Sequence, residues 1–345
     1  MKILLTGAFG NLGASTLENL LLRKKHDIVC FDLRNPRNIK ERDRLSSKGD
    51  FKTLWGDITD PDIVAQAVEG QECILHLAAI IPPLSEQFPD LTHGVNIVGT
   101  RNIIAAAKLQ ERPPKIVFTS SVTVHGNRFS DPPPRRAHEP PQPQDTYASS
   151  KAASEKELIE SGLEWTILRV GAAMPVDVVG RNAFNSLSYN FGIPLEQRIE
   201  LVHPADVATA IANCVEADTA GRILYLGGGK SCQMTNRLFQ TKLFQALGIG
   251  MVSEKAFRVP KDESDYWTTD FMDTEESQQL LKFQNHSFDH YIADLKRVFG
   301  WRRVFTNVFS PIIRNWITRQ SPYYNTSGAL VTSQVSAINK DGPVG

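Results

Sequence analysis

The chain has 345 residues, enough for one large or two smaller domains, and 41% of them are hydrophobic. Lysine plus arginine equals aspartate plus glutamate at 38 each, so no net charge favours nucleic acid or a membrane surface as a partner. No apolar run reaches the ~20 residues that span a bilayer, and only Met1 and Lys2 precede the first strand-like segment, which argues against a signal peptide. The four cysteines lie far apart without metal-ligand spacing. We therefore expect a cytoplasmic protein without a metal, without nucleic acid and without membrane contact.

Short β-branched runs alternate along the chain with longer segments of helical periodicity. The expected strands cover residues 2–6, 27–32, 51–55, 73–77, 115–120, 166–170 and 223–226. The expected helices cover residues 11–23, 61–68, 95–109, 148–160 and 205–217. This alternation predicts an α/β fold with a doubly wound parallel sheet, covered by helices on both faces. We expect residues 1–170, completed by about 201–227, to form the sheet domain, and 171–200 with 228–300 to form a smaller C-terminal substrate region.

Three glycines lie where the first strand turns into the first helix, in the sequence TGAFGNLG. Gly7 would permit the tight turn, Gly10 the close approach of a phosphate, and Gly13 the close packing of helix on strand. A pyrophosphate there would meet the free N–H groups of Asn11, Leu12 and Gly13 at the positive end of the helix dipole. The alternative is a glycine-rich turn that serves packing alone. The position between a strand and a helix favours a Rossmann-type dinucleotide site.

An acidic residue ends the second expected strand, which strengthens this prediction. Asp32 follows Gly13 by 19 residues, where a carboxylate can accept both ribose hydroxyls of an adenosine and repel a 2′-phosphate. NAD is therefore favoured over NADP, although Arg34 is a cation that could accept that phosphate. We expect the third and fourth strands to complete the cofactor site, with Asp57 and Ile58 near the adenine and with Ala78 and Ala79 beside the pyrophosphate.

A tyrosine and a lysine lie four residues apart at the start of a later helix, in YASSK. Tyr147 and Lys151 therefore share one helix face. The ammonium group would favour the phenolate form of the tyrosine, which can exchange a proton with a substrate hydroxyl. Ser121, at the end of the fifth expected strand, would orient the substrate oxygen if both segments reach the same edge of the sheet. The alternatives are an exposed helix face and a serine that serves only the turn.

With these motifs the chain resembles the extended short-chain dehydrogenase/reductase family, the NAD-dependent epimerase/dehydratase group, over roughly residues 1–300. The resemblance rests on TGAFGNLG, GDITD, HLAA, VNIVGTRNII, TSSVTVHG, YASSK and HPADVA. It implies that Ser121, Tyr147 and Lys151 form the catalytic triad and that NAD is the cofactor. It also implies that Asn96 lies in a helix bracing the site, and that the proline-rich segment 130–146 is a loop near the pocket.

Departures from the family patterns bear on the reaction. Val122 and Thr123 replace the Asp-Glu pair of sugar dehydratases, so elimination of water is not expected. Ala172 replaces the asparagine that holds the diphosphate in nucleotide-sugar epimerases. His125 is either a second proton-transfer group or a packed aromatic residue. We therefore favour a dehydrogenase or reductase acting on a small-molecule alcohol or ketone, with an epimerase and a non-catalytic NAD-binding regulator as alternatives.

Two further segments have a distinctive composition. Apolar residues dominate 171–200, which suits either packing of the small region or a hydrophobic substrate. Residues 301–319 carry an apolar stripe at helical spacing, with arginines off the stripe, and Ser310-Pro311 predicts a break into two helices. The stripe could pack on the protein's own core, form a homodimer or contact a membrane surface. The polar tail 320–345 is expected to be poorly ordered.

Overall fold

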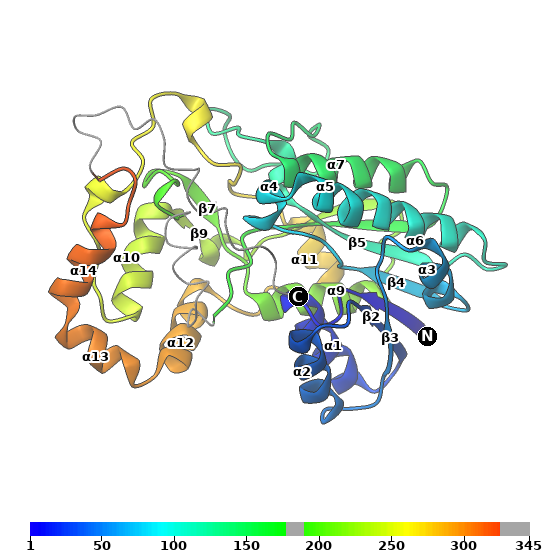
Figure 1. The fold of residues 1–345 in the computed structure, drawn as a ribbon. Helices are drawn as coiled ribbons and strands as arrows, with labels where there is room; N and C mark the ends of the chain where they lie inside the picture. The colour runs from blue at the N-terminus through cyan, green and yellow to red at the C-terminus, as the bar shows by residue number, and fades with distance from the viewer. Residues whose placement is uncertain (177–189, 325–345) are drawn as a thin grey trace. The chain divides into compact units, whose positions relative to one another are not determined.

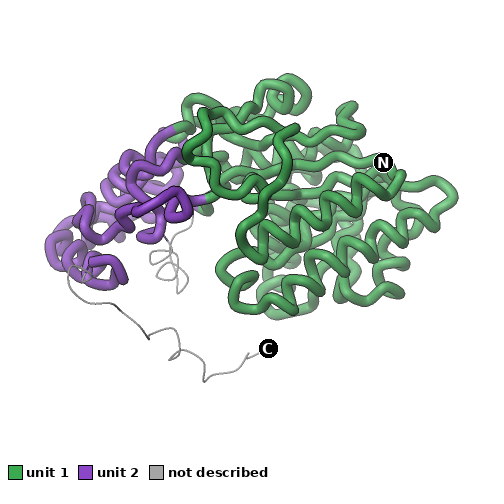
Figure 2. The backbone as a smooth tube through the Cα atoms, turned by 90° about the horizontal axis from the view of Figure 1, so that it is seen from above, with its two compact units in different colours: residues 1–175, 199–233, 268–288 green, residues 176–198, 234–267, 289–345 purple. Residues whose placement is uncertain are grey.

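The computed structural model describes residues 1–176 and 190–324 of the chain. It divides into two compact units (Figure 2). Unit 1 comprises residues 1–175, 199–233 and 268–288, and unit 2 comprises 176–198, 234–267 and 289–345. Residues 228–233 and 268–288, which we had expected in the substrate region, therefore lie in unit 1. Residues 177–189 of the apolar segment 171–200 and residues 325–345 of the polar tail lie outside the described residues.

Unit 1 contains a seven-stranded parallel sheet with the order β3-β2-β1-β4-β5-β6-β8 (Figure 1). Its strands are β1 (Lys2–Thr6), β2 (Asp27–Asp32), β3 (Lys52–Trp55), β4 (Cys73–His76), β5 (Lys115–Ser121), β6 (Trp165–Val170) and β8 (Arg222–Leu226). Two short strands, β7 (Arg198–Glu200) and β9 (Gln233–Thr235), pair separately. The expected doubly wound fold is confirmed, and every expected strand is present to within one residue at each end.

The helices of unit 1 alternate with these strands. They are α1 (Asn11–Arg23), α2 (Pro36–Ser46), α3 (Pro61–Val68), α4 (Leu84–Gln87), α5 (Pro89–Thr92), α6 (Gly99–Lys108), α7 (Thr146–Ile159), α9 (Pro204–Cys214) and α11 (Glu275–Leu281). A π-helical segment, η1 (His93–Val98), precedes α6, and a 3₁₀ turn, η2 (Val122–His125), follows β5. The expected helix 95–109 is thus two segments of different winding. Helix α2 was not predicted.

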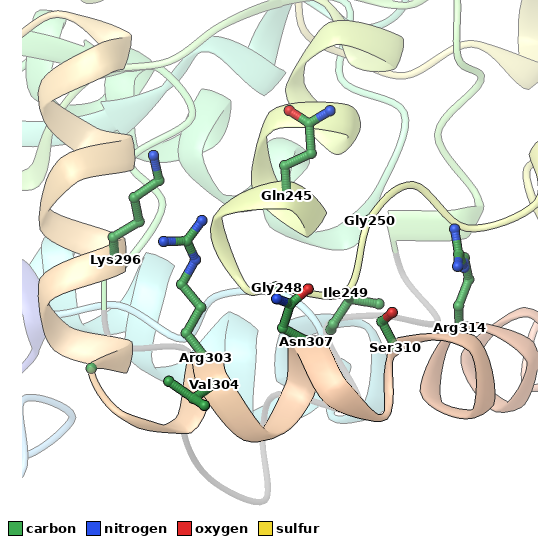
Figure 3. Close-up of a pocket in the computed structure, with 11 residues that line it drawn as sticks. Gln245, Gly248, Ile249, Gly250, Lys296, Arg303, Val304, Asn307, Ser310 and Arg314 are labelled. Carbon is green, nitrogen blue, oxygen red and sulfur yellow. The ribbon is translucent and has the colours of Figure 1, made fainter.

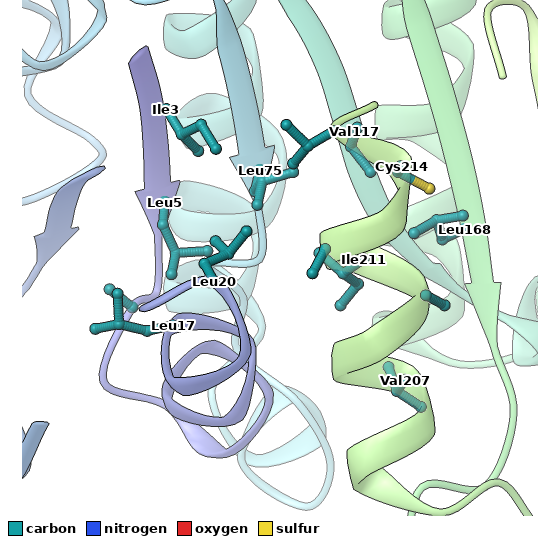
Figure 4. Close-up of a cluster of buried hydrophobic side chains, with 14 of the residues drawn as sticks. Ile3, Leu5, Leu17, Leu20, Leu75, Val117, Leu168, Val207, Ile211 and Cys214 are labelled. Carbon is teal, nitrogen blue, oxygen red and sulfur yellow. The ribbon is translucent and has the colours of Figure 1, made fainter. Parts of the chain in front are cut away.

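Two apolar clusters hold the sheet, one on each face. Ile3 and Leu5 of β1 pack with α1 and α9 in the cluster that Figure 4 shows, whereas Leu4, between them, belongs to the opposite cluster with α3 and α6. Successive strand side chains point to opposite faces, so a strand buried on both faces must be apolar throughout. This is why the strands read as continuous apolar runs in the sequence.

Unit 2 contains α10 (Asn236–Ala246), most of α12 (Phe288–Phe299), α13 (Arg302–Val308) and α14 (Ser310–Arg319). Its core cluster joins Phe191, Phe244 and Phe257 with Ile317 of α14. The predicted break in the C-terminal stripe is confirmed, but the residue before α14 is Phe309 and Ser310 is its first helical residue. No helix in the described part of the chain is long and apolar enough to cross a membrane.

Candidate active site

The glycine turn joins β1 to α1 in a shape that only glycine permits at two positions. Gly7 has a φ of +64°, and a Cβ built there would lie 2.8 Å from the backbone nitrogen of Ala78. A Cβ at Gly13 would lie 2.0 Å from the carbonyl oxygen of Gly7. At Gly10 the corresponding gap is 3.3 Å, so packing alone does not demand a glycine there. No side chain among the described residues caps α1, which leaves its first N–H groups for a ligand.

Asp32 lies beside this turn at the end of β2. Its Oδ2 accepts a hydrogen bond from the Phe9 backbone N–H at 2.8 Å, and its Oδ1 accepts from the Leu33 N–H and the Asn38 amide at 2.8 and 3.1 Å. Burial raises the pKa of this carboxyl, and the hydrogen bonds from Phe9 and Leu33 oppose the rise. The cation that approaches the turn is Arg37, which donates to the Asn11 side chain at 3.1 Å. Arg34 is exposed.

The residues predicted after β3 and β4 differ in what they contact. Ala78 lies against the glycine turn and donates its N–H to the Thr6 hydroxyl at 3.2 Å. Ala79 is half-buried beside it. Asp57 accepts from the backbone and the hydroxyl of Thr59, both at 2.9 Å, and Ile58 is buried against Gly99. Both of these hydrogen bonds of Asp57 therefore stabilise the turn in which it lies.

A buried histidine ties the ends of β1 and β4 to α6. His76 Nδ1 lies 2.8 Å from the Thr6 hydroxyl, and its Nε2 lies 2.9 Å from the Thr100 hydroxyl. Thr100 already donates to the carbonyl of Asn96 at 2.6 Å, so it must accept from Nε2–H. Thr6 accepts two backbone N–H groups and therefore donates to Nδ1. The imidazole is neutral in this arrangement, and burial lowers its pKa to about 3.

Tyr147, Lys151 and Ser121 meet at the carboxyl edge of the sheet. The Ser121 side chain is close enough to the Tyr147 phenol to act on its pKa as a hydrogen-bond partner, and the Ser121 Oγ also accepts from the Thr123 hydroxyl at 3.0 Å. Lys151 is buried, donates to the Thr119 carbonyl at 2.8 Å, and has its Nζ 6.0 Å from the centre of the Tyr147 ring. β5 lies two strands from β1, about 10 Å at the usual spacing between strands. A dinucleotide that starts at the glycine turn can bridge that distance.

The protein's own groups do not make the Tyr147 phenol acidic. Burial raises its pKa to about 12, and the hydrogen bond to Ser121 opposes the rise. Burial also lowers the pKa of Lys151 to about 7, with the Glu155 carboxylate opposing that change. The lysine is then only partly protonated at neutral pH. The expected lowering of the tyrosine pKa by Lys151 is therefore not produced by the protein alone, because desolvation outweighs it.

Two polar side chains fix the start of α7. Glu86 accepts from the backbone N–H groups of Thr146 and Tyr147, both at 3.1 Å. Burial alone would raise the pKa of Glu86, but these hydrogen bonds lower it. Asn96, in the π-helical segment, exchanges hydrogen bonds with both backbone groups of Ile80 and donates to the Ser150 hydroxyl at 2.9 Å. The bracing that the family resemblance implied for Asn96 is present as direct contacts.

His125 belongs to a buried charged network. Its Nε2 faces the Arg169 guanidinium at 3.0 Å and the hydroxyl of Tyr225. Arg169 also forms two hydrogen bonds to Glu155, at 2.7 and 3.0 Å. Burial lowers the pKa of His125 to about 3, with Arg169 adding to the effect. These contacts favour the packed role over the proton-transfer role that the sequence left open.

The proline-rich segment 130–146 lies against η2, the turn that follows β5. Gln142 donates its backbone N–H to the Val124 carbonyl at 2.8 Å. Arg135, which is 6% exposed, lies 3.4 Å from Glu139 and 3.6 Å from Asp270. Ion pairs thus hold an irregular loop in place next to η2, as expected for a loop near the pocket.

Comparison with known proteins places the chain in a family. The model of the 3-beta hydroxysteroid dehydrogenase/isomerase family matches residues 4–172. The L-arabinose 1-dehydrogenase (NAD(P)(+)) of Haloferax volcanii is 31% identical over 193 residues, which cover 52% of this chain and 69% of that enzyme. The chain belongs to the extended short-chain dehydrogenase/reductase family.

Other members of the family resemble it over shorter or more divergent stretches. The 3-beta-hydroxysteroid dehydrogenase of Mycolicibacterium neoaurum is 34% identical over 128 residues, covering 36% of this chain and about a third (32%) of that protein. Among solved structures, a UDP-glucuronic acid 4-epimerase from Bacillus cereus in complex with NAD has a TM-score of 0.71 at 18% identity. It aligns with 87% of this chain and 99% of that one, which shows the shared fold.

Several residues of this extended short-chain dehydrogenase/reductase site escaped the sequence analysis. Asn38 and Glu86 support the predicted residues Asp32 and Tyr147 through hydrogen bonds. His76 acts indirectly, because it bonds Thr6, whose hydroxyl accepts the N–H of Ala78. Glu86 and His76 reach partners 61 and 70 residues away, and such contacts leave no local pattern. Asn38 has a local signal, since it follows an Asn-Pro helix start directly after the strand that ends in Asp32.

Proposed function

We propose that this protein is an NAD-dependent dehydrogenase/reductase that interconverts a secondary alcohol and a ketone. The observation that carries the proposal is the contact of Tyr147 with Ser121 above a buried Lys151, two strands from the glycine turn. Open α/β sheets bind ligands at this edge, where the order of strands reverses.

The residues at the turn fit a dinucleotide. The uncapped N-terminus of α1 and the absence of a side chain at Gly10 suit a pyrophosphate, which the N–H groups of Asn11, Leu12 and Gly13 would hold. Asp32 would accept the ribose hydroxyls, with Ile58 and Asp57 on the adenine side and Ala78 and Ala79 along the pyrophosphate. When bound, the oxidised nicotinamide supplies a two-electron hydride acceptor and a positive charge beside Tyr147.

Tyr147 then exchanges the proton of the reaction. A nearby positive charge favours phenolate and so opposes the burial that raises the pKa of this phenol. In oxidation, the substrate O–H bond breaks and its proton goes to the Tyr147 oxygen, while the carbinol hydrogen leaves as hydride. Ser121 orients the substrate oxygen. The protonated form of Lys151 stabilises the phenolate. Reduction reverses each transfer.

We assign NAD rather than NADP on the charge of Asp32. The carboxylate is held by the Phe9 and Leu33 N–H groups, so it cannot swing away from a 2′-phosphate without breaking both hydrogen bonds. Arg37 is the nearest cation to the turn, and its hydrogen bond to Asn11 turns it toward α1. The carboxylate therefore decides the preference.

We assign the substrate to the class of apolar secondary alcohols and their ketones. Ala172 cannot donate a hydrogen bond to a diphosphate, and the match to the 3-beta hydroxysteroid dehydrogenase family extends to this residue. The substrate region proposed from the sequence, residues 171–200 and 228–300, would supply the apolar lining.

An epimerase is the second candidate. The hydroxyls of Ser120, Ser121 and Thr123 follow the pattern of sugar epimerases, and the UDP-glucose 4-epimerase of Mycolicibacterium smegmatis is 34% identical over 159 residues, 45% of this chain and 49% of that one. An epimerase regenerates its cofactor, so it would purify with NAD bound and give no net change in absorbance at about 340 nm. A dehydrogenase would form NADH in proportion to product.

The test replaces the phenol. Tyr147→Phe should lower kcat by roughly 10²–10⁴ while the Kd for NAD, measured by calorimetry, changes little. Tyr324→Phe, a change of the same kind near the end of the described chain, serves as the control. Full turnover by Tyr147→Phe would refute the assigned chemistry, and its loss would also exclude a non-catalytic NAD-binding regulator.

A further inference from the structure

The last helices of unit 2 expose a row of large apolar side chains. Eight of them are at least 37% exposed, and we call them the apolar stripe: Val298, Trp301, Val304, Phe305, Val308, Phe309, Ile312 and Trp316. α13 has no buried side chain, and α14 buries only Ile317 and Thr318. Of the stripe expected from the sequence, Ile313 and Ile317 do pack on the core of unit 2, whereas the eight side chains of the apolar stripe remain exposed. The rings of Phe305 and Phe309 lie 4.6 Å apart, and exposed large apolar side chains that gather in this way mark an interaction site.

The same segment is strongly cationic. Between Leu295 and Gln320 the sequence has six basic residues and no acidic one: Lys296, Arg297, Arg302, Arg303, Arg314 and Arg319. Among the described residues, only Arg297 has a carboxylate within ion-pair distance, that of Asp294 at 2.7 Å. The balanced charge of the whole chain hides this local excess. An anionic partner would complement it.

Three of these cations line one pocket. Lys296, Arg303 and Arg314 surround a pocket of about 740 Å³ between α12, the turn after α10 and the α13–α14 pair (Figure 3). Its other polar side chains are those of Gln245, Asn307 and Ser310, and no acidic residue lines it. In Figure 3, Arg303 and Arg314 point to the same side of the two helices. The pocket can therefore accept an anionic group such as a phosphate.

A second copy of the chain is a poor match for this surface. Two copies meeting through the apolar stripe would bring six cations against six more, and like charges at an interface oppose association. A lipid surface rich in acidic headgroups supplies both an apolar layer and negative charge. Trp301 and Trp316 lie near the two ends of the stripe, and indole rings favour the boundary between headgroups and acyl chains.

We propose that α13 and α14 dock unit 2 on an anionic membrane surface. The apolar stripe enters the boundary between headgroups and acyl chains, and the arginines of the two helices bind lipid phosphates. The helices have 7 and 10 residues, so they lie on the membrane and do not cross it. The proposal replaces our expectation of no membrane contact, which rested on net charge. It is independent of the proposed reaction.

Sedimentation of the full chain with vesicles tests the proposal. We expect the protein to bind vesicles containing about one third phosphatidylserine, to bind phosphatidylcholine vesicles far more weakly, and to be released by high salt. A triple variant, Trp301→Ser/Val308→Ser/Ile312→Ser, should lower vesicle affinity at least about tenfold. Its matched control changes equally exposed residues elsewhere, in Leu22→Ser/Leu109→Ser/Val259→Ser, and should bind as the wild type does.

Two further experiments test the two parts of the proposal separately. Removal of arginine charges tests the binding of lipid phosphates, and fluorescence quenching tests the insertion of the apolar stripe. Arg302→Gln/Arg303→Gln/Arg319→Gln should lower affinity for anionic vesicles by about fivefold per cation and leave the weak binding to phosphatidylcholine unchanged. Lipids brominated on the acyl chains should quench tryptophan fluorescence. Trp301→Phe/Trp316→Phe should abolish that quenching while retaining vesicle binding.

Three results would overturn the proposal. The first is no sedimentation with anionic vesicles, and the second is sedimentation that the serine variant leaves unchanged. The third is a concentration-dependent dimer in analytical ultracentrifugation that the serine variant abolishes, in the absence of vesicle binding, which would assign the surface to a second copy. Circular dichroism and thermal unfolding of each variant report folding separately, and Tyr147 lies outside the changed residues, so failure here leaves the proposed function standing.

Discussion

Burial sets the chemistry of single residues at this site. Tyr147 and Lys151 are both desolvated, which disfavours the charged form of each: the pKa of the phenol rises to about 12 and the pKa of the amine falls to about 7. An ion pair of phenolate and ammonium thus needs a further charge close by. The site is therefore able to couple proton transfer to coenzyme binding.

The buried lysine should also leave a signature in stability. Its pKa falls from 10.5 to about 7 on folding, so between these values the unfolded chain holds a proton that the native state lacks. The free energy of unfolding then rises with pH across this window. We expect urea unfolding to show that the free energy of unfolding of the wild type rises relative to that of Lys151→Met between about pH 7 and pH 10. Lys156→Met, on the exposed side of the same helix, should show a flat difference.

Asp32 should control the choice of coenzyme. Asp32→Asn removes the charge that repels a 2′-phosphate, but its single carbonyl oxygen can accept from only one of the Phe9 and Leu33 N–H groups, which bind different oxygens of Asp32. The ratio of kcat/KM for NAD to that for NADP should fall by at least about tenfold, the equivalent of 1.4 kcal/mol. Asp27→Asn, at the other end of β2, is the control. An unchanged ratio would show that another residue selects the coenzyme.

Single residues could be predicted where their spacing is fixed by local structure. Gly7 and Gly13 lie at a strand-to-helix turn, and Tyr147 and Lys151 lie one helical turn apart, so the chain itself carries the pattern. Glu86 could not be predicted, because it meets Tyr147 through the folding of segments 61 residues apart. The raised pKa of Tyr147 could not be predicted from the sequence either, because it depends on how deeply the phenol is buried.

Helix α7 links the reaction to the interior of unit 1. Tyr147, Lys151 and Glu155 are spaced four residues apart along one face of the helix. Both carboxylate oxygens of Glu155 accept hydrogen bonds from the Arg169 guanidinium of β6. The pair is almost fully buried. The helix is thereby fixed in rotation as well as in position.

Breaking this pair from one side should be costly. Glu155→Gln leaves the Arg169 charge buried without its counterion, and we expect a loss of about 3–5 kcal/mol in the free energy of unfolding. Glu157→Gln, two residues on, removes an exposed partner of Arg101 at 2.6 Å and should cost less than about 1 kcal/mol. Chemical denaturation of both variants measures the contrast. Similar losses for the two would show that the buried pair has no special role.

At the scale of elements, apolar periodicity predicted what burial produces. The expected strands and the expected first helix agree with the structure because each of them buries apolar side chains at regular spacing. Helix α2 was missed since it buries only Asn38 and Leu45, which leaves no apolar period to detect. The π-helical winding of η1 was missed for another reason. The apolar spacing around Asn96 fits a helix of either winding, and Asn96 contacts Ile80 and Ser150, which lie far from it in the sequence.

The division of the whole molecule into two units predicts how it responds to coenzyme. The proposed NAD site lies entirely in unit 1, whereas the Phe191–Ile317 core belongs to unit 2. We expect calorimetry to resolve two unfolding transitions. NAD at 100 times its Kd should stabilise the unit 1 transition by about 2.7 kcal/mol and leave the other nearly unchanged. Equal shifts of both transitions would mean that the units unfold together.

The way the chain passes back and forth between the units also bears on synthesis. The last segment of unit 1 ends at residue 288, whereas the core of unit 2 needs Ile317, close to the end of the described chain. On a ribosome, the sheet can therefore assemble and bind its nucleotide while the second unit still lacks α14, the helix that completes its core. Nascent chains whose residues up to 309, but not α14, have left the ribosome would hold a finished first unit and an open second one, which exposes phenylalanines to chaperones at that moment.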